Sequence, residues 1–276
     1  MNTNQRNKPW WLLFHLLGLD APLAALAWAL VYVHVFSIID IPNEPIFLLC
    51  IAVWVFLLIT RLIDISIRKD IPAISWKASF FHAHLFPLCL LLLCALLAIF
   101  WMSFFYVGRY FLSLILPPFL LWLFSVSLPC MWRHFSNAQI LLQSWAFALS
   151  CSAPAWFCLI YQSPAGMLSF PPTLALTVLI FLFLLGRRDS GRELNERCAS
   201  LHAALPIGIF LLLIYCIAAA WLAGASEKPF YYAIAMGAAF LQILDRLCLL
   251  LPMALITTLG WLLIALPAFF SHLFFI

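Results

Sequence analysis

The stretch HLFPLCLLLLCALLAIFWMSFFY, residues 84–106, decides the fold class of this protein. Behind His84 it holds no Asp, Glu, Lys or Arg, and it is long enough to cross a bilayer. A helix needs about 20 apolar residues to cross the ~30 Å hydrocarbon core. A run this long is typical of a transmembrane helix, because the apolar segments of soluble domains are shorter. The sequence therefore predicts that the chain crosses a membrane here.

The same composition extends over the whole chain of 276 residues. Hydrophobic residues make up 67% and charged residues 9%, with 26 Phe and 12 Trp, so one soluble core of this size cannot bury the apolar surface. Apolar runs recur between short polar breaks. We predict spans at residues 17–38, 46–66, 84–106, 110–131, 139–161, 172–186, 205–223, 229–245 and 249–272. We expect an all-α, polytopic integral membrane protein of about nine transmembrane helices, forming a single transmembrane domain over residues 1–276.

The distribution of Lys and Arg predicts the orientation of these spans, because short loops rich in Lys and Arg stay in the cytoplasm. With the N-terminus inside, the inside segments hold Arg6, Lys8, Arg61, Arg68, Lys69, Lys77, Arg133, Arg187, Arg188, Arg192, Arg197 and Arg246. The outside segments hold only Arg109 and Lys228. A missed span would move every later loop to the other side, so this split supports nine spans with the N-terminus in and the C-terminus out.

The net charge of +4 fits this topology and the anionic lipid of the inner leaflet. It gives no indication of a nucleic-acid partner. The expected location is the bacterial inner (cytoplasmic) membrane, with the membrane lipid as a partner along the spans.

Two loops on the predicted cytoplasmic side gather acidic and basic residues. The loop after the second span holds Asp64 with Arg68 and Lys69, and the loop after the sixth holds Asp189 and Glu193. Arg192, Glu196 and Arg197 lie in the second of these loops. On one helix, positions 189, 193 and 196 would share a face, with both Arg residues beside it. Carboxylate oxygens are ligands for Mg²⁺, and guanidinium groups bind phosphate oxygens in bidentate fashion.

A simpler interpretation of these loops stays open. Interleaved charges in a cytoplasmic loop are also typical of a solvated helix end whose Arg residues fix the orientation. Exposed ion pairs of this kind contribute only about 0–1 kcal/mol each. The residues alone do not separate this interpretation from a phosphate-binding site.

Three segments match motifs of one known family. In LLGLDAPLAALAWAL, residues 16–30, Asp20 and Pro22 fit L-x-R-L-D-x-P, with Gly18 in place of Arg. RLIDISIRKD, residues 61–70, stands where N-x-x-x-D-x-x-x-D is expected. Counted from Thr60, Asp64 is in place, and Arg68 takes the next acidic position. In DSGRELNERCASLHAALP, residues 189–206, Asp189 and Glu193 fit D-x-x-x-D, and the T-L-P turn that follows lacks its Thr. In these segments and in its layout the chain resembles the UbiA superfamily of intramembrane prenyltransferases.

The resemblance implies a bundle of nine helices around a cavity that opens sideways to lipid. It implies that the acidic loops hold an isoprenoid diphosphate through Mg²⁺, and that the prenyl cation alkylates a hydrophobic acceptor, aromatic or lipid. Under this resemblance the expected catalytic and metal-binding residues are Asp64, Asp189 and Glu193. The expected substrate-binding residues are Arg68, Lys69, Arg192, Arg197 and Asp20.

Two other functions and a second role for Asp20 remain open. The incomplete first motif favours a catalytically silent protein of the same fold, acting in lipid binding or complex assembly. A small-solute transporter is the third candidate, disfavoured because Asp20 is the only acidic residue well inside a span. Asp20 either faces cavity water or a basic loop residue, or lies in an interfacial stretch beside headgroups.

Overall fold

The protein is all-helical wherever its structure is described. The computed structural model describes residues 17–36, 42–67, 80–81, 83–131, 136–162, 170–189, 196–247 and 259–268. The helices are α2 (Asp20–Val35), α3 (Asn43–Ile67), α5 (Leu85–Met102), the π-helix η2 (Ser103–Val107), α6 (Arg109–Met131), α7 (Ser136–Gln162), α8 (Phe170–Asp189), α9 (Glu196–Leu222) and α10 (Lys228–Leu247). A further helix covers Leu259–Ala268. Each of the nine predicted ranges thus contains a helix in the described part of the chain.

Three helices in the described residues are long and apolar enough to cross a membrane. They cover Asn43–Ile63, Leu85–Tyr106 and Leu205–Leu222. Four further apolar segments are shorter, at Asp20–Val35, Ile115–Ser127, Pro171–Gly186 and Leu259–Ala268. This confirms the all-α class and is compatible with a membrane protein, as the composition predicts.

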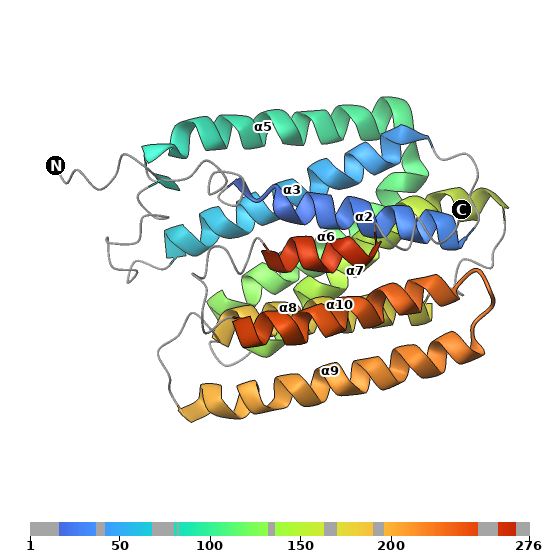
Figure 1. The fold of residues 1–276 in the computed structure, drawn as a ribbon. Helices are drawn as coiled ribbons and strands as arrows, with labels where there is room; N and C mark the ends of the chain where they lie inside the picture. The colour runs from blue at the N-terminus through green and yellow to red at the C-terminus, as the bar shows by residue number, and fades with distance from the viewer. Residues whose placement is uncertain are drawn as a thin grey trace.

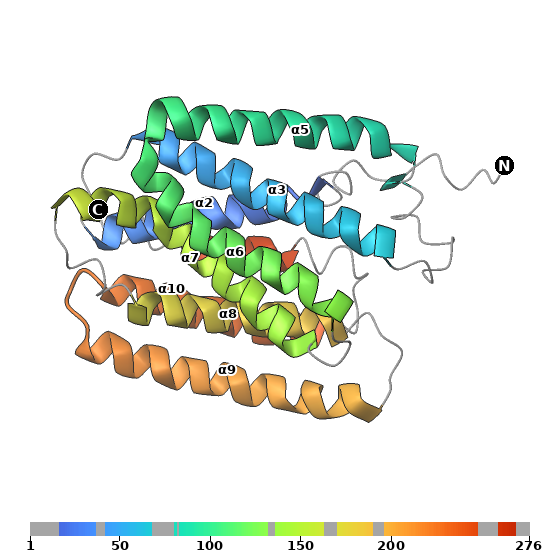
Figure 2. The ribbon, with the colours of Figure 1, turned by 180° about the vertical axis from the view of Figure 1, so that it is seen from behind.

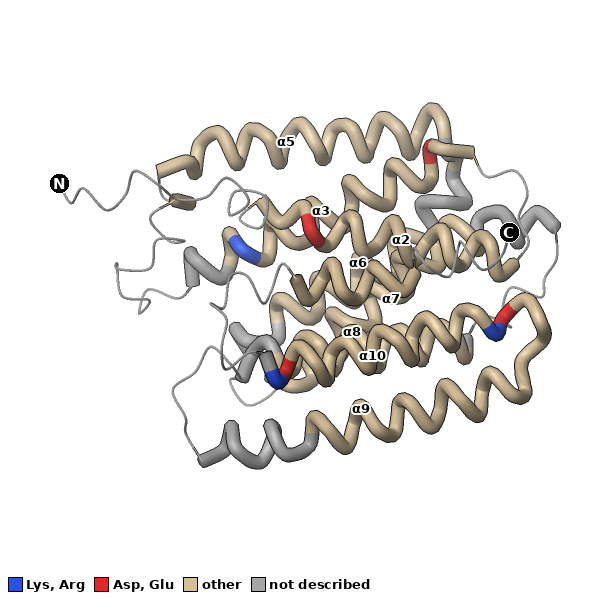
Figure 3. The backbone as a smooth tube through the Cα atoms, viewed as in Figure 1, with Lys and Arg blue, Asp and Glu red and all other residues tan. Residues whose placement is uncertain are grey.

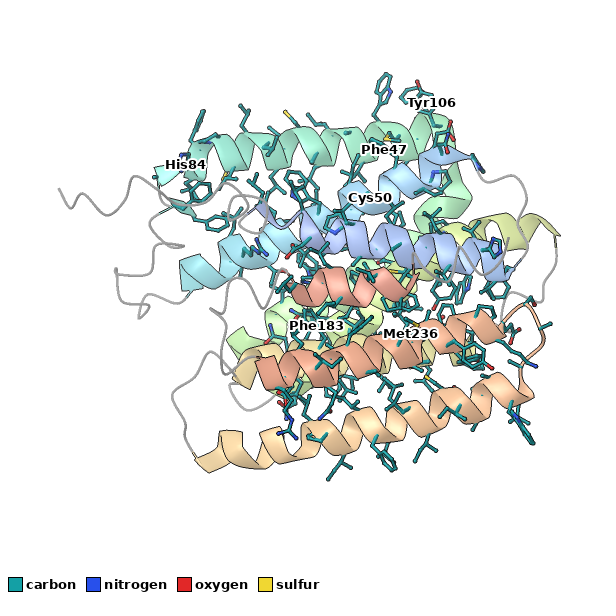
Figure 4. All side chains as sticks on the ribbon, in the orientation of Figure 1. Phe47, Cys50, His84, Tyr106, Phe183 and Met236 are labelled. Atoms are coloured by element: carbon teal, nitrogen blue, oxygen red, sulfur yellow. The ribbon has the colours of Figure 1, made fainter. Side chains whose placement is uncertain are left out.

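The helices lie side by side along one common direction, with α5 at one edge of the bundle and α9 at the opposite edge (Figures 1 and 2). α5 packs mainly on α3, and α9 packs on α8 and α10. Large apolar side chains of both edge helices are exposed, for example Phe86 and Phe100 on α5 and Phe210 and Trp221 on α9. Figure 4 shows such side chains pointing away from the bundle along α5. In water this apolar surface would be unfavourable, whereas lipid solvates it.

α8 forms the centre of the second half of the bundle, in contact with α7, α9 and α10. Its residues Ala175, Leu176, Leu179 and Ile180 have no exposed surface. Apolar side chains cover all sides of most of α8. This pattern is typical of a buried helix and not of an amphipathic surface helix.

Glycines on three neighbouring helices make room for large side chains of α8. A Cβ at Gly237 of α10 would lie 3.1 Å from a methyl carbon of Leu179, and one at Gly208 of α9 would lie 2.7 Å from Leu182. A Cβ at Gly260 would overlap the ring of Phe183. The absence of side chains at these glycines lets the helices approach closely, as is common in membrane bundles.

Most charged residues in the described part of the chain lie toward the two ends of the bundle, and the acidic first residue of α2 lies further inside (Figure 3). Glu44 belongs to the first turn of α3, and Lys228 begins α10 at the same end. Arg61 lies near the end of α3, and Arg246 lies in the last turn of α10. Apart from Asp20, this separation leaves the middle of the described bundle apolar, which is compatible with a membrane protein.

Candidate functional site

The candidate site begins at the turn that precedes α2. Gly18 has a φ of +71°, which is the left-handed region that glycine enters without steric penalty. The indole Nε1 of Trp54 on α3 donates a hydrogen bond to the carbonyl of Leu17 at 2.8 Å, which fixes this turn against α3. α2 then begins at Asp20.

Asp20 is a buried carboxylate at the first turn of α2, with 1% of its surface exposed. Its Oδ1 accepts a hydrogen bond from the backbone N–H of Ala21 at 3.2 Å. The positive end of the helix dipole favours a carboxylate at this position. Asp20 is therefore enclosed by the protein, and its position relative to the lipid headgroups stays a prediction.

Arg61 of α3 lies against this turn, beside Gly18. It interacts electrostatically with Asp20. Its Cζ and Nη1 atoms lie 3.3 Å from the place where a Cβ on residue 18 would stand. A side chain at position 18 would press on the guanidinium, so Gly18 provides both the turn and the space for Arg61.

A small apolar cluster includes Leu17 of this turn and Trp54 of α3. Leu58, Phe81 and Leu88 form a small buried cluster, and Leu17, Trp54 and Leu62 pack against it. A charge pair in such surroundings is exposed to less water than one at a surface, so each charge depends on its partner. Removing one partner would leave the other charge uncompensated.

Thr60, next to Arg61, connects α3 to α6. Its hydroxyl donates to the carbonyl of Phe56 at 2.8 Å and accepts a hydrogen bond from Nε1 of Trp122 at 3.1 Å. The ring of Trp122 also stacks on Phe56, with centroids 5.0 Å apart. These contacts restrain the last turns of α3, the segment that holds both Arg61 and the predicted ligand Asp64.

Two of the predicted metal ligands belong to helix ends that lie at the same end of the bundle. Asp64 is in the last turn of α3, and Asp189 is the last residue of α8. Figures 1 and 2 both show these ends of α3 and α8 on the side of the bundle where α2 and α9 begin. α2 and α7 pack next to α3, and α7 also packs on α8. The side chains of Asp64 and Asp189 lie outside the described part.

One helix does not carry both Asp189 and Glu196, so the condition for a helical face shared by these two residues is not met. Asp189 ends α8, whereas Glu196 begins α9. The two helices run in opposite directions (Figure 1), so one helix does not carry both carboxylates. Arg197 lies in the first turn of α9, with its side chain outside the described part. Arg68, Lys69, Arg192 and Glu193 lie outside the described residues.

A metal-binding group of three or more His, Cys, Asp or Glu side chains does not occur among the residues searched, which are those the structure describes. That search does not reach Glu193 or the side chains of Asp64 and Asp189. No family model, no curated protein and no solved structure matches this chain.

Arg61 is absent from the site predicted from the sequence. The charge distribution places it among the basic residues of the predicted cytoplasmic side, and it does not belong to the acidic motif. Two signals pointed to it. Gly18 stands where the family pattern has Arg, and Arg61 precedes Asp64 by one helical turn of α3. The electrostatic interaction joins Asp20 and Arg61, which are 41 positions apart along the chain, and no local pattern predicts it.

Proposed function

We propose that this chain is a UbiA-like intramembrane prenyltransferase. It transfers a prenyl group from an isoprenoid diphosphate to an aromatic or lipid acceptor and requires Mg²⁺. Its nine helices cross the bacterial inner membrane with the N-terminus in the cytoplasm. The substrate's diphosphate is held at the cytoplasmic end of the bundle, and its prenyl chain lies among the apolar helices.

The observation that carries this proposal is the arrangement of helix ends. α3 and α8 bring residues 64 and 189 to one end of the bundle, and the Asp20–Arg61 pair belongs to segments at that same end. Departure of a diphosphate leaves negative charge, which Mg²⁺ held by Asp64, Asp189 and Glu193 would stabilise together with Arg68, Lys69, Arg192 and Arg197. The carbocation left behind is short-lived in water, and apolar helix surfaces exclude water.

A second candidate is a catalytically silent protein of the same fold, acting in lipid binding or complex assembly. The position of Arg68 in the first motif favours it, because Arg stands where the family has a carboxylate. This candidate predicts binding of a prenyl chain without any dependence on metal.

Metal-dependent binding distinguishes the two candidates. The full chain is purified in phosphatidylcholine nanodiscs, and binding of a fluorescent farnesyl diphosphate analogue is measured with Mg²⁺ and with EDTA. Asp189→Asn keeps the side-chain size but removes the charge that a hard cation requires, so Mg²⁺-dependent binding should fall sharply. Glu44→Gln, which removes a carboxylate at the opposite end of the bundle, is the matched control and should bind as the wild type does.

Each alternative outcome has a defined meaning. Equal wild-type binding in Mg²⁺ and EDTA would reject the prenyltransferase and favour the silent lipid-binding protein. Wild-type binding that requires Mg²⁺ but is unchanged in Asp189→Asn would reject the site at residue 189.

A further inference from the structure

We propose that Arg61 binds phosphate oxygens of the prenyl diphosphate and that Asp20 is a positioning residue that acts through Arg61. This inference rests on the proposed function, because it assigns two roles within the same site. It also changes the expected role of Asp20, which the sequence motif indicates as a substrate-binding residue.

Asp20 is poorly suited to touch the substrate itself. Only 1% of its surface is exposed, and Oδ1 already accepts the N–H of Ala21. A carboxylate also repels a diphosphate unless a cation stands between them. What Asp20 offers is a fixed negative charge beside Arg61.

Arg61 has the chemistry that Asp20 lacks. Its guanidinium keeps its proton at any physiological pH and presents a planar fork of N–H donors that matches phosphate oxygens. The side chain is partly exposed, in contrast to Asp20. Since α3 continues through residue 64, Arg61 precedes the predicted ligand Asp64 by one turn, on the same side of the helix.

The surroundings hold the guanidinium in one place before any ligand arrives. Gly18 leaves room for it at 3.3 Å, and the hydrogen bond from Trp54 to Leu17 fixes the backbone of that turn. A long Arg side chain ordinarily loses conformational entropy when it binds, and prior ordering reduces that loss. Asp20 and the turn at Gly18 therefore hold the Arg61 guanidinium, the proposed phosphate-binding group, beside the first turn of α2.

The competing explanation is a purely structural pair that ties α2 to α3. Both explanations predict that Arg61→Gln lowers stability, so the test needs a ligand that differs only in its phosphate. Farnesol has the prenyl chain of farnesyl diphosphate without its charge. A structural role would change the affinity for both ligands, whereas phosphate binding by Arg61 changes only the affinity for the diphosphate.

The experiment measures farnesyl diphosphate and farnesol binding by calorimetry on the full chain in phosphatidylcholine nanodiscs. Arg61→Gln should weaken farnesyl diphosphate binding roughly 10- to 100-fold, as expected for the loss of charge-assisted hydrogen bonds, and leave farnesol binding unchanged. Arg61→Lys keeps the charge without the fork and should bind with intermediate affinity. Arg246→Gln removes an exposed Arg from the last turn of α10 and serves as the matched control, with no loss expected.

Asp20→Asn tests the positioning role. It should weaken farnesyl diphosphate binding, and the double variant Asp20→Asn/Arg61→Gln should bind no more weakly than Arg61→Gln alone, because Asp20 acts only through Arg61. Additive losses would overturn the positioning role. If Arg61→Gln does not fold, Arg61→Lys tests the proposal instead. Wild-type affinity for farnesyl diphosphate in Arg61→Lys would overturn the proposal that the guanidinium fork binds the phosphate oxygens.

The arms with Mg²⁺ and with EDTA separate this inference from the proposed function. Farnesyl diphosphate binding that persists in EDTA and still depends on Arg61 supports Arg61 and rejects the metal-dependent enzyme. Metal-dependent binding that is unchanged in Arg61→Gln rejects only the phosphate-binding role of Arg61. If the wild type does not bind farnesyl diphosphate at all, both the role of Arg61 and the proposed prenyltransferase function are rejected. If phosphatidylglycerol in the nanodiscs abolishes the difference between wild type and Arg61→Gln, a lipid headgroup occupies the guanidinium, which overturns its assignment to the prenyl substrate.

Discussion

Single Gly→Ala substitutions around α8 should destabilise the protein in an order set by the space at each glycine. A Cβ at Gly260 would overlap Cε2 of Phe183, with Cζ at 2.9 Å and a methyl carbon of Leu244 at 3.2 Å. At Gly208 the nearest atom is a Leu182 methyl carbon at 2.7 Å, and at Gly237 it is a Leu179 methyl carbon at 3.1 Å. At Gly224 nothing lies within 4 Å.

Two opposing effects determine the magnitude of each change. Ala is favoured over Gly inside a helix by roughly 0.5–1 kcal/mol, whereas overpacking a core costs about 1–3 kcal/mol. At Gly237 the Leu179 methyl needs to move only a few tenths of an ångström, so the effects nearly cancel. At Gly208 a flexible Leu end absorbs a larger shift, and we expect a net loss of about 1 kcal/mol.

Gly260→Ala should be the most damaging substitution. The ring of Phe183 is rigid and packs edge-to-face on Trp261, with centroids 5.0 Å apart, so both rings must move together. We expect a net loss of about 2 kcal/mol, which lowers the melting temperature by roughly 4–8 °C for a chain of this size.

Thermal unfolding in detergent, followed by tryptophan fluorescence, measures this series. Gly224→Ala is the control in open space and should melt close to the wild type. If Gly260→Ala melts as high as Gly224→Ala, or if Gly237→Ala is the least stable of the four, the close packing of these helices on α8 is refuted.

Two further predictions concern orientation and the buried core. Reporter fusions placed after Gln162 and after Ile276 should both report the outer side of the membrane, and a cytoplasmic signal from either would refute nine spans. Tyr32→Phe removes the hydrogen bond from its hydroxyl to Oγ1 of Thr173, 3.1 Å away, and should lower the free energy of unfolding by about 1 kcal/mol. An unchanged free energy of unfolding in Tyr32→Phe would show that this hydrogen bond does not stabilise the bundle.

The positions of the helices are predictable from the sequence because apolar length is a local property. The range 229–245 corresponds to α10 at Lys228–Leu247, and the range 172–186 lies inside α8. Helix ends are less predictable. Hydropathy marks the apolar stretch of a helix, whereas the end of a helix is set by its backbone hydrogen bonds. α9 begins at Glu196, nine residues before the predicted range, and continues through Pro206.

The candidate site is only partly predictable for a related reason. Asp20 is identifiable from the sequence because a carboxylate inside an apolar run is energetically unfavourable, which makes it a candidate functional residue. Its electrostatic interaction with Arg61 depends on how α2 packs on α3, and on a turn at Gly18 whose positive φ no pattern of charges reveals. The roles of Asp64, Asp189 and Glu193 stay predictions.

The exposed edge helix α5 also determines how the protein matches its bilayer. With its π-helical extension the apolar segment Leu85–Tyr106 has 22 residues, which corresponds to a length of about 33 Å at 1.5 Å per residue. α2 has 16 residues, or about 24 Å, and is buried by its neighbours. Under the proposed membrane topology, lipid would contact the longer helix, and a slight tilt of α5 would match it to a core of ~30 Å. Under the same topology the shorter α2 would begin below the headgroups, which would place Asp20 at hydrocarbon depth while the surrounding bilayer keeps its ordinary thickness.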